Sequence, residues 1–269
     1  ARHNLNFTIG KQFVNFGGYE YYVNSIRVRE FSEFNNLLTA YQAGISGNWQ
    51  VSPDHELCFQ IVNNRNGNDE DIYPTGLPEG TAKAKIPFMY TVNWNSYYLD
   101  KTLQLRYATA VGQQTRKRYS YYFTCGNTYE KGPLLTYLDV MYTRQGIDQH
   151  GVVSRLPGTP HTAMNTEYLS IIGDVDYRVH PQWNVYVKGA YETAWVYKSN
   201  GDFRKGMYRR SWNAQSSVEF FPFKQLDLFV FVLYTYRGVI LEKAATRMGA
   251  IEPDTHRISL GLVYSIPVF

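Results

Sequence analysis

The sequence is dominated by short segments in which apolar and polar residues alternate. The clearest of them, residues 224–238, reads KQLDLFVFVLYTYRG. Side chains of an extended strand point alternately to its two faces. One face of this segment therefore carries an apolar residue at every second position from Leu226 to Tyr236, whereas the other is mixed and includes Asp227 and Arg237. A chain built from such segments is expected to fold as β-sheet with one apolar and one mixed face.

Twelve segments follow this alternating pattern, and no segment has the apolar spacing of an amphipathic helix. They span roughly residues 3–12, 40–51, 54–64, 83–96, 101–112, 117–126, 131–144, 164–180, 182–198, 209–222, 224–237 and 255–268. The pattern predicts an all-β fold. The chain lacks a run of about 18 apolar residues, which excludes transmembrane helices. Alternation alone also fits a soluble β-sandwich, which has one buried and one wet face.

The connections between these segments separate the two alternatives. Short connections, such as SPD (52–54) and HPQ (180–182), alternate with long ones, such as 64–83 and 144–163. One end of the structure therefore has short turns and the other has long loops. Outer-membrane barrels have this anatomy, with short periplasmic turns and longer external loops. Since an open sheet edge leaves backbone groups unpaired in hydrocarbon, such a sheet must close.

Aromatic residues support the barrel. The chain contains 24 Tyr, 15 Phe and 5 Trp, and several Trp residues, including Trp49 and Trp183, fall near strand ends, where girdles form at the membrane interfaces. We therefore predict that residues 1–269 form a single transmembrane antiparallel up-and-down β-barrel, integral to a bacterial outer membrane. The net charge of +4 is too small to indicate a nucleic-acid partner. Cys58 and Cys125 are predicted to face opposite sides and to stay unpaired.

The longest connection, residues 13–39, follows the first predicted strand. If the last segment runs toward the periplasm, this connection is external, and we expect it to fold into the lumen as a constriction loop. General porins with sixteen strands have such a loop after their fifth strand. Twelve visible strands would then be part of a sixteen-stranded barrel whose first four strands precede residue 1. The alternative is a complete twelve-stranded barrel, which can also close.

The same region carries a family resemblance. Residues 5–24, LNFTIGKQFVNFGGYEYYVN, resemble the strand and loop start of outer-membrane porins of the phosphate-selective porin family, particularly the Bacteroidetes-type members. The resemblance implies a sixteen-stranded passive channel and a homotrimer. Better-known members line the pore with a ladder of arginines and lysines for anions, and this sequence does not reveal where such a ladder would lie. Outside residues 5–24 the likeness is one of architecture.

The alternation of side chains along each strand predicts which charged side chains face the lumen. The inward positions are Arg106, Arg118, Arg178, Lys188, Arg257, Asp139, Asp174, Asp176, Glu192, Glu219 and Asp227. Charges of both signs would set a transverse field across a water-filled pore. Alternatively, they pair with one another and stiffen a wet wall.

The loop 13–39 adds four candidates for a pore constriction: Arg27, Arg29, Glu30 and Glu33. Arg27 and Arg29 suit an anion-attracting constriction, because the planar guanidinium can bind two oxygens of an oxyanion. Anchoring of the loop to carboxylates of the wall is the alternative role for these two arginines.

The predicted function is a passive diffusion channel for small hydrophilic solutes or anions, with a preference for anions or phosphate left open. Its expected partners are outer-membrane lipid and lipopolysaccharide. One alternative is a structural or complex-associated barrel without an open pore. Another is an outer-membrane phospholipase or protease, which would need a Ser–His–polar chain or an Asp–His pair at the outer rim, where Asp148, Ser154, Asp254 and His256 are expected. The His-containing strand motif of the phospholipase is absent, so we expect no enzyme and assign no catalytic residue, cofactor or metal.

Overall fold

The computed structural model describes residues 4–22, 32, 41–64, 73, 76–82, 84–85, 87–149, 151–156, 161–223 and 228–265. Its strands are β1 (Leu5–Phe13), β2 (Tyr41–Ser52), β3 (His55–Asn63), β4 (Phe88–Tyr98), β5 (Leu103–Gln113), β6 (Tyr119–Lys131), β7 (Leu134–Ile147), β8 (Met164–His180), β9 (Trp183–Val196), β10 (Gly206–Phe220), β11 (Leu228–Leu241) and β12 (Thr255–Tyr264). Two short helices are α1 (Tyr19–Tyr22) and α2 (Lys243–Thr246). The strands form one antiparallel sheet, ordered from β1 to β12 as in the sequence.

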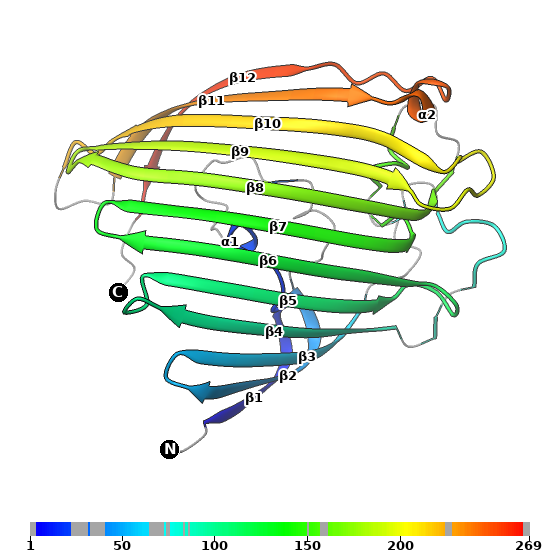
Figure 1. Cartoon of the computed structure of the whole chain (residues 1–269), viewed down its shortest axis with the longest axis horizontal. Coiled ribbons are helices and arrows are strands. Elements are labelled where there is room, and N and C mark those ends of the chain that lie inside the picture. The colour runs from blue at the N-terminus through cyan, green and yellow to red at the C-terminus, as the bar shows by residue number, and fades with distance from the viewer. Residues whose placement is uncertain are drawn as a thin grey trace.

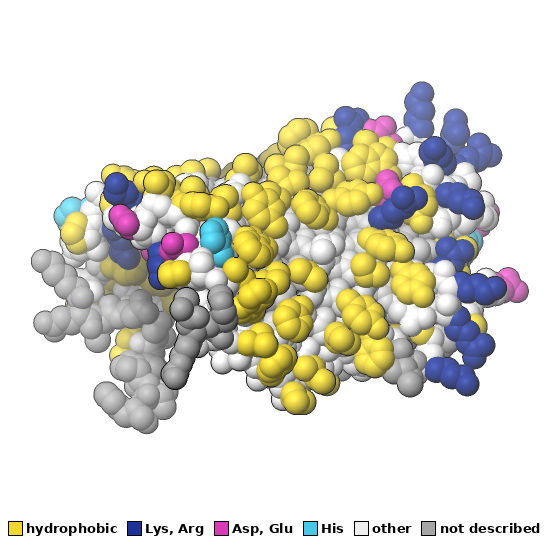
Figure 2. Space-filling model, turned by 60° about the horizontal axis from the view of Figure 1, so that its bottom comes forward, with side chains coloured by type: hydrophobic (Ala, Val, Ile, Leu, Met, Phe, Trp, Pro, Cys, Tyr) yellow, Lys and Arg dark blue, Asp and Glu magenta, His cyan; other side chains and the backbone are white. Residues whose placement is uncertain are grey.

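The sheet is strongly curved, and α1 lies within the curve behind β6 and β7 (Figure 1). The alternation determines which side chains face inward. On β11, Phe229, Phe231 and Leu233 are buried, whereas Val230 and Val232 are exposed on the outer face. Apolar side chains cover much of that outer face (Figure 2). An apolar surface this extensive is typical of contact with another apolar phase.

The two edges of the sheet are β1 and β12. Within the described residues, β1 pairs with β2 and β12 pairs with β11, but the two edges do not pair with each other. Outward side chains at the edges are correspondingly bare: Ile9 is 79% exposed and Leu260 is 77% exposed, against 50% for Val232 inside the sheet. The twelve strands therefore form a curved sheet that is open between β1 and β12, and they do not by themselves meet the expectation of a closed barrel.

Short turns and long connections lie at opposite ends of the strands, as the sequence predicts. Two of the predicted turns were misplaced. Residues 126–130 continue β6, and the chain turns at 132–133, where Gly132 has a φ of +58°. β4 extends to Tyr98, and the following turn holds Leu99 and Asp100 in the left-handed region, with φ of +52° and +54°. Left-handed backbone is uncommon at residues with a Cβ, and Leu99 is not among the residue types enriched there.

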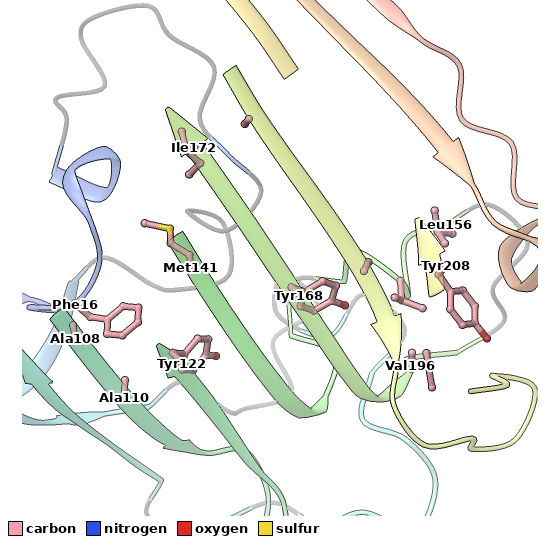
Figure 3. Close-up of a cluster of buried hydrophobic side chains, with 14 of the residues drawn as sticks. Phe16, Ala108, Ala110, Tyr122, Met141, Leu156, Tyr168, Ile172, Val196 and Tyr208 are labelled. Carbon is pink, nitrogen blue, oxygen red and sulfur yellow. The ribbon is translucent and has the colours of Figure 1, made fainter. Parts of the chain in front are cut away.

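Buried apolar side chains gather on the concave side (Figure 3). Phe16, which follows β1, packs in one cluster with inward residues of the wall, among them Tyr122, Met141, Tyr168 and Ile172. The two helices were not predicted, because four residues are too few to produce a helical period. No helix within the described part of the chain has both the length and the apolar character to cross a membrane.

Candidate functional site

The concave side of the sheet holds a stretch of chain that we call the inner segment, residues 14–22, which leaves β1 and ends with α1. Its side chains Val14, Phe16 and Glu20 are buried. Phe16 meets Tyr122 of β6 edge-on, with ring centroids 6.0 Å apart. The segment therefore lies against the inner wall.

The first contact fixes the point where the chain leaves β1. The backbone N–H of Asn15 donates to Oε1 of Gln60 on β3 at 2.7 Å. The side-chain Oδ1 of Asn15 accepts a hydrogen bond from the side-chain amide of Asn93 on β4 at 3.0 Å and another from the hydroxyl of Tyr22 at 2.7 Å. Amide groups of the wall thus satisfy polar groups of a chain that has left the sheet.

Asp139 of β7 holds the start of α1. Its two carboxylate oxygens accept the backbone N–H groups of Tyr19 and Glu20 at 3.0 and 2.8 Å. These N–H groups have no partner inside a short helix, so the carboxylate supplies one. Hydrogen bonds to an ionised acceptor are stronger than those between neutral groups.

Two glycines allow the inner segment to approach this carboxylate. A Cβ on Gly18 would lie 2.3 Å from the Asp139 carboxyl carbon. On the wall, a Cβ on Gly126 of β6 would lie 2.6 Å from Oδ1 of Asp139 and 2.9 Å from the Cα of Gly18. Real Cβ atoms do not approach other heavy atoms this closely, and hydrogen bonds from Tyr19 and Glu20 hold the Asp139 carboxylate in place, so the close approach requires glycine on both sides.

Glu20 forms the second anchor. Its carboxylate is paired with the ammonium group of Lys188 on β9, and the side chains are only 1% and 2% exposed. Ser32 donates to the same carboxylate through its hydroxyl at 2.5 Å. Removing one partner of a buried ion pair is costly, because it leaves an uncompensated charge. We call Glu20, Asp139 and Lys188 the latch.

Four more predicted carboxylates of the wall lie on the same buried side. These are Asp174, Asp176, Glu192 and Glu219. Their neighbours include neutral side chains: Asn184 donates to Asp176 at 2.7 Å and to Glu219 at 3.0 Å, and Ser170 donates to Glu192 at 2.9 Å. Lys188 stands opposite Asp174 in the register of β8 and β9.

Comparisons with known proteins decide the family. A family model described as phosphate-selective porin O and P matches residues 2–266. The chain belongs to this porin family. It is an integral porin of the bacterial outer membrane, and porins of this kind are channels, not enzymes. No curated protein matches its sequence.

Solved structures of other outer-membrane proteins resemble the porin in fold. The outer membrane channel DcaP of Acinetobacter baumannii aligns with a TM-score of 0.65 at 12% identity, over 98% of this chain and 74% of that one. The OmpT loop L8 deletion mutant of Vibrio cholerae gives 0.58 at 12% identity, over 96% and 74%. A trimer form of OmpT from Vibrio cholerae gives 0.54 at 13% identity, over 95% and 74%.

The predicted arginines of the porin are spread over the wall. Arg106 donates to Asn95 at 3.0 Å and lies 4.1 Å from the ring centroid of Tyr22, so it contacts the inner segment. Arg118 donates to the carbonyl of Gly146. The other two are Arg178, which lies 3.8 Å over the ring of Phe221 near the short-turn end, and Arg257, which is exposed on β12. Asp227, Arg27, Arg29, Glu30 and Glu33 lie outside the described residues.

Groups that a hydrolase would need serve as structural contacts in the porin. Asp254 accepts the backbone N–H of Val239 at 2.9 Å, and the His256 ring is 2.8 Å from the hydroxyl of Tyr234. In the outer connection after β7, buried Asp148 accepts the hydroxyl of Ser154 at 2.6 Å. Burial raises the pKa of Asp148, and the hydrogen bonds from Ser154 and Tyr168 act in the opposite direction. Among the described residues, no three His, Cys, Asp or Glu side chains are grouped as metal ligands.

Sequence reasoning identified Asp139 and Lys188 as inward charges but did not find their partner Glu20. The signal that could have found it is the pair Gly17–Gly18, two small residues that precede Tyr19 and Glu20 in the motif of residues 5–24. Consecutive glycines in an otherwise bulky segment indicate that backbone must approach another surface closely.

Proposed function

We propose that the porin is a passive diffusion channel for small hydrophilic solutes, with a preference for anions, and that residues 13–39 are its constriction loop. The observation that supports this most is the latch, which fixes the start of that loop against the wall at Asp139 and Lys188. A segment anchored on β7 and β9 after leaving β1 crosses a large part of the concave side. It would therefore reduce the space open to solutes.

Arg27 and Arg29 are the groups we propose for anion attraction. Replacing both with Ala should lower anion over cation permeability, since guanidinium groups at a constriction attract oxyanions. Reversal potentials in planar bilayers under a salt gradient measure this. The matched variant Glu30→Gln with Glu33→Gln should shift selectivity the opposite way. Unchanged selectivity in the arginine variant would remove both residues from the mechanism, and a bilayer without conductance steps would favour a plugged structural barrel.

We also propose that the barrel has sixteen strands. The unpaired edges of β1 and β12 support this, because unsatisfied backbone groups cost several kcal/mol each in hydrocarbon. Sixteen strands minus the twelve described leaves four to bridge the gap. We expect the native polypeptide to have a mass well above the 31.2 kDa of residues 1–269. Intact-mass measurement of the protein from its native membrane tests this, and a mass near 31.2 kDa would contradict it.

The porin's further partners are inferred from its family and its surface. The trimer form of the related fold supports a homotrimer, which cross-linking in native membranes would reveal. The motif in residues 5–24 supports the Bacteroidetes-type branch of the family. Its apolar outer face and the basic side chains at one end support contact with outer-membrane lipid and lipopolysaccharide.

A further inference from the structure

Two cavities adjoin at the end of the sheet where the long connections lie. One, of about 830 Å³, lies between the β9–β10 connection and α2. The other, of about 440 Å³, is lined by residues at the ends of β7, β8 and β9. Lys205 and Gly206 line both cavities, so the two are neighbours.

The larger cavity is basic. Its lining includes Arg204, Lys205, Lys243 and Arg247, all of them exposed. Within the described part of the chain none of these four forms an ion pair. The acidic side chains of the same cavity are Glu242, which is paired with Arg210, and Asp202, whose carboxylate is 3.9 Å from the His161 ring. Lys and Arg side chains gather at this end of the molecule (Figure 2). The cavity therefore has positive charge to offer an anion.

The smaller cavity is a largely apolar groove on the outer face. Tyr142 and Leu169 are register partners on β7 and β8, and Trp195 stands opposite Glu167 on β9 and β8. Their sequence neighbours Thr143, Tyr168 and Ala194 are buried on the inner side, so the groove faces the membrane. Polar groups border it, because Arg144 is 3.5 Å from Glu167 and stacks on Tyr197.

A β-bulge lies where the cavities meet. The register of β9 and β10 shifts between Met207 and Arg209, and Gly206 has a φ of +153°. A bulge bends its strand and redirects nearby side chains. Here it lies beside Lys205 and Gly206, the two residues that line both the apolar groove and the basic cavity.

We infer that the two cavities form one binding site for a phosphorylated lipid of the outer leaflet. Its phosphate would lie among Lys205, Lys243 and their basic neighbours, and an acyl chain would lie along Leu169 and Trp195. Free phosphate would use the basic cavity alone and give the adjoining groove no role. A neutral lipid would use the groove but not the cations. The inference depends on the proposed function only for the orientation that puts the long connections outside.

The test is native mass spectrometry of the detergent-solubilised porin titrated with diphosphorylated lipid A. The variant Lys205→Ala with Lys243→Ala should bind it about 30-fold more weakly, from the loss of two basic groups near a phosphate. The matched control is Arg116→Ala with Lys117→Ala, which removes two cations from a different cavity of the same rim. This control should leave binding unchanged, and both variants should keep the wild-type conductance, which reports on the pore independently of the lipid.

Three further arms separate the sources of the signal. Lipid A without phosphates should bind as weakly to the wild type as lipid A binds to the lysine variant. Inorganic phosphate at millimolar concentration should displace little lipid, and Trp195→Ala should weaken lipid binding while sparing conductance. Three results would each overturn the inference. They are an equal loss of lipid binding in the Lys205/Lys243 and Arg116/Lys117 double variants, full displacement of the lipid by phosphate, and equal binding of lipid A with and without its phosphates.

Discussion

Replacing Lys188 with Met is expected to release the inner segment and raise the single-channel conductance of the porin. Glu20 would lose the ammonium group that faces its carboxylate, in a place where its side chain is 1% exposed. Removing one member of a buried ion pair costs about 3–5 kcal/mol. Undocking the segment relieves that cost by returning Glu20 to water. Planar-bilayer recordings should therefore show larger and noisier current steps than those of the wild type.

A double variant distinguishes the latch from a simple change of charge in the lumen. Adding Glu20→Gln to Lys188→Met removes the negative charge as well, and replacing both partners of a buried pair is often close to neutral. We expect this double variant to recover most of the wild-type conductance and melting temperature in detergent. If Lys188→Met alone conducted like the wild type, the ion pair would have no part in holding the segment.

The second large effect is expected from a single methyl group, in Gly126→Ala. Its Cβ would lie 2.6 Å from Oδ1 of Asp139, which the backbone N–H of Tyr19 holds in place, and 2.9 Å from the Cα of Gly18, which is backbone. Overpacking of this kind costs about 1–3 kcal/mol. We expect the segment to lift from the wall, so conductance rises, the melting temperature falls and limited proteolysis cuts near Tyr22.

Gly189→Ala is the control for this substitution. Gly189 is on the same curved sheet, next to Lys188, but a Cβ there meets no atom within 4 Å. It adds the same volume and no charge, so conductance and proteolysis should match the wild type. Equal effects of the two substitutions would point to a general loss of wall stability and away from a specific contact between Gly126 and the inner segment.

The sequence predicted the side that each strand residue faces far better than the partner it contacts. Segment 164–180 was predicted with the bounds that β8 has, and Lys188 and Glu192 lie on the predicted side. Parity suffices for this, because adjacent side chains of a strand must point to opposite faces. Cys58 is buried and Cys125 is partly exposed, as alternation also predicted, and both are free.

Contacts of the inner segment could not be predicted in the same way. Glu20 and Lys188 are 168 residues apart, and the segment that carries Glu20 has no periodicity to fix its orientation. Asp139 was predicted to face inward, but nothing in its own strand indicates that its oxygens accept the N–H groups of Tyr19 and Glu20. Such pairings depend on the curvature of the whole sheet.

The positions of the turns could not be predicted correctly for a different reason. The left-handed residues Leu99, Asp100 and Lys101 follow β4 without a glycine among them. Sequence signals for turns depend mostly on Gly, Pro, Asn and Asp. Here Asp100 is flanked by Leu99 and Lys101, which carry no such signal, and the turn is set by the pairing of β4 with β5, which extends to the partners Tyr98 and Leu103.

The position of the latch also determines when during folding its contacts can form. Glu20 emerges with the first strands described here, but its counterpart on β9 is reached only 168 residues later. Contacts between residues so distant in the chain form late, since the intervening chain must be organised first. A partly folded barrel would thus have no narrowed lumen. The inner segment would be fixed in place only after the wall that carries Lys188 has formed.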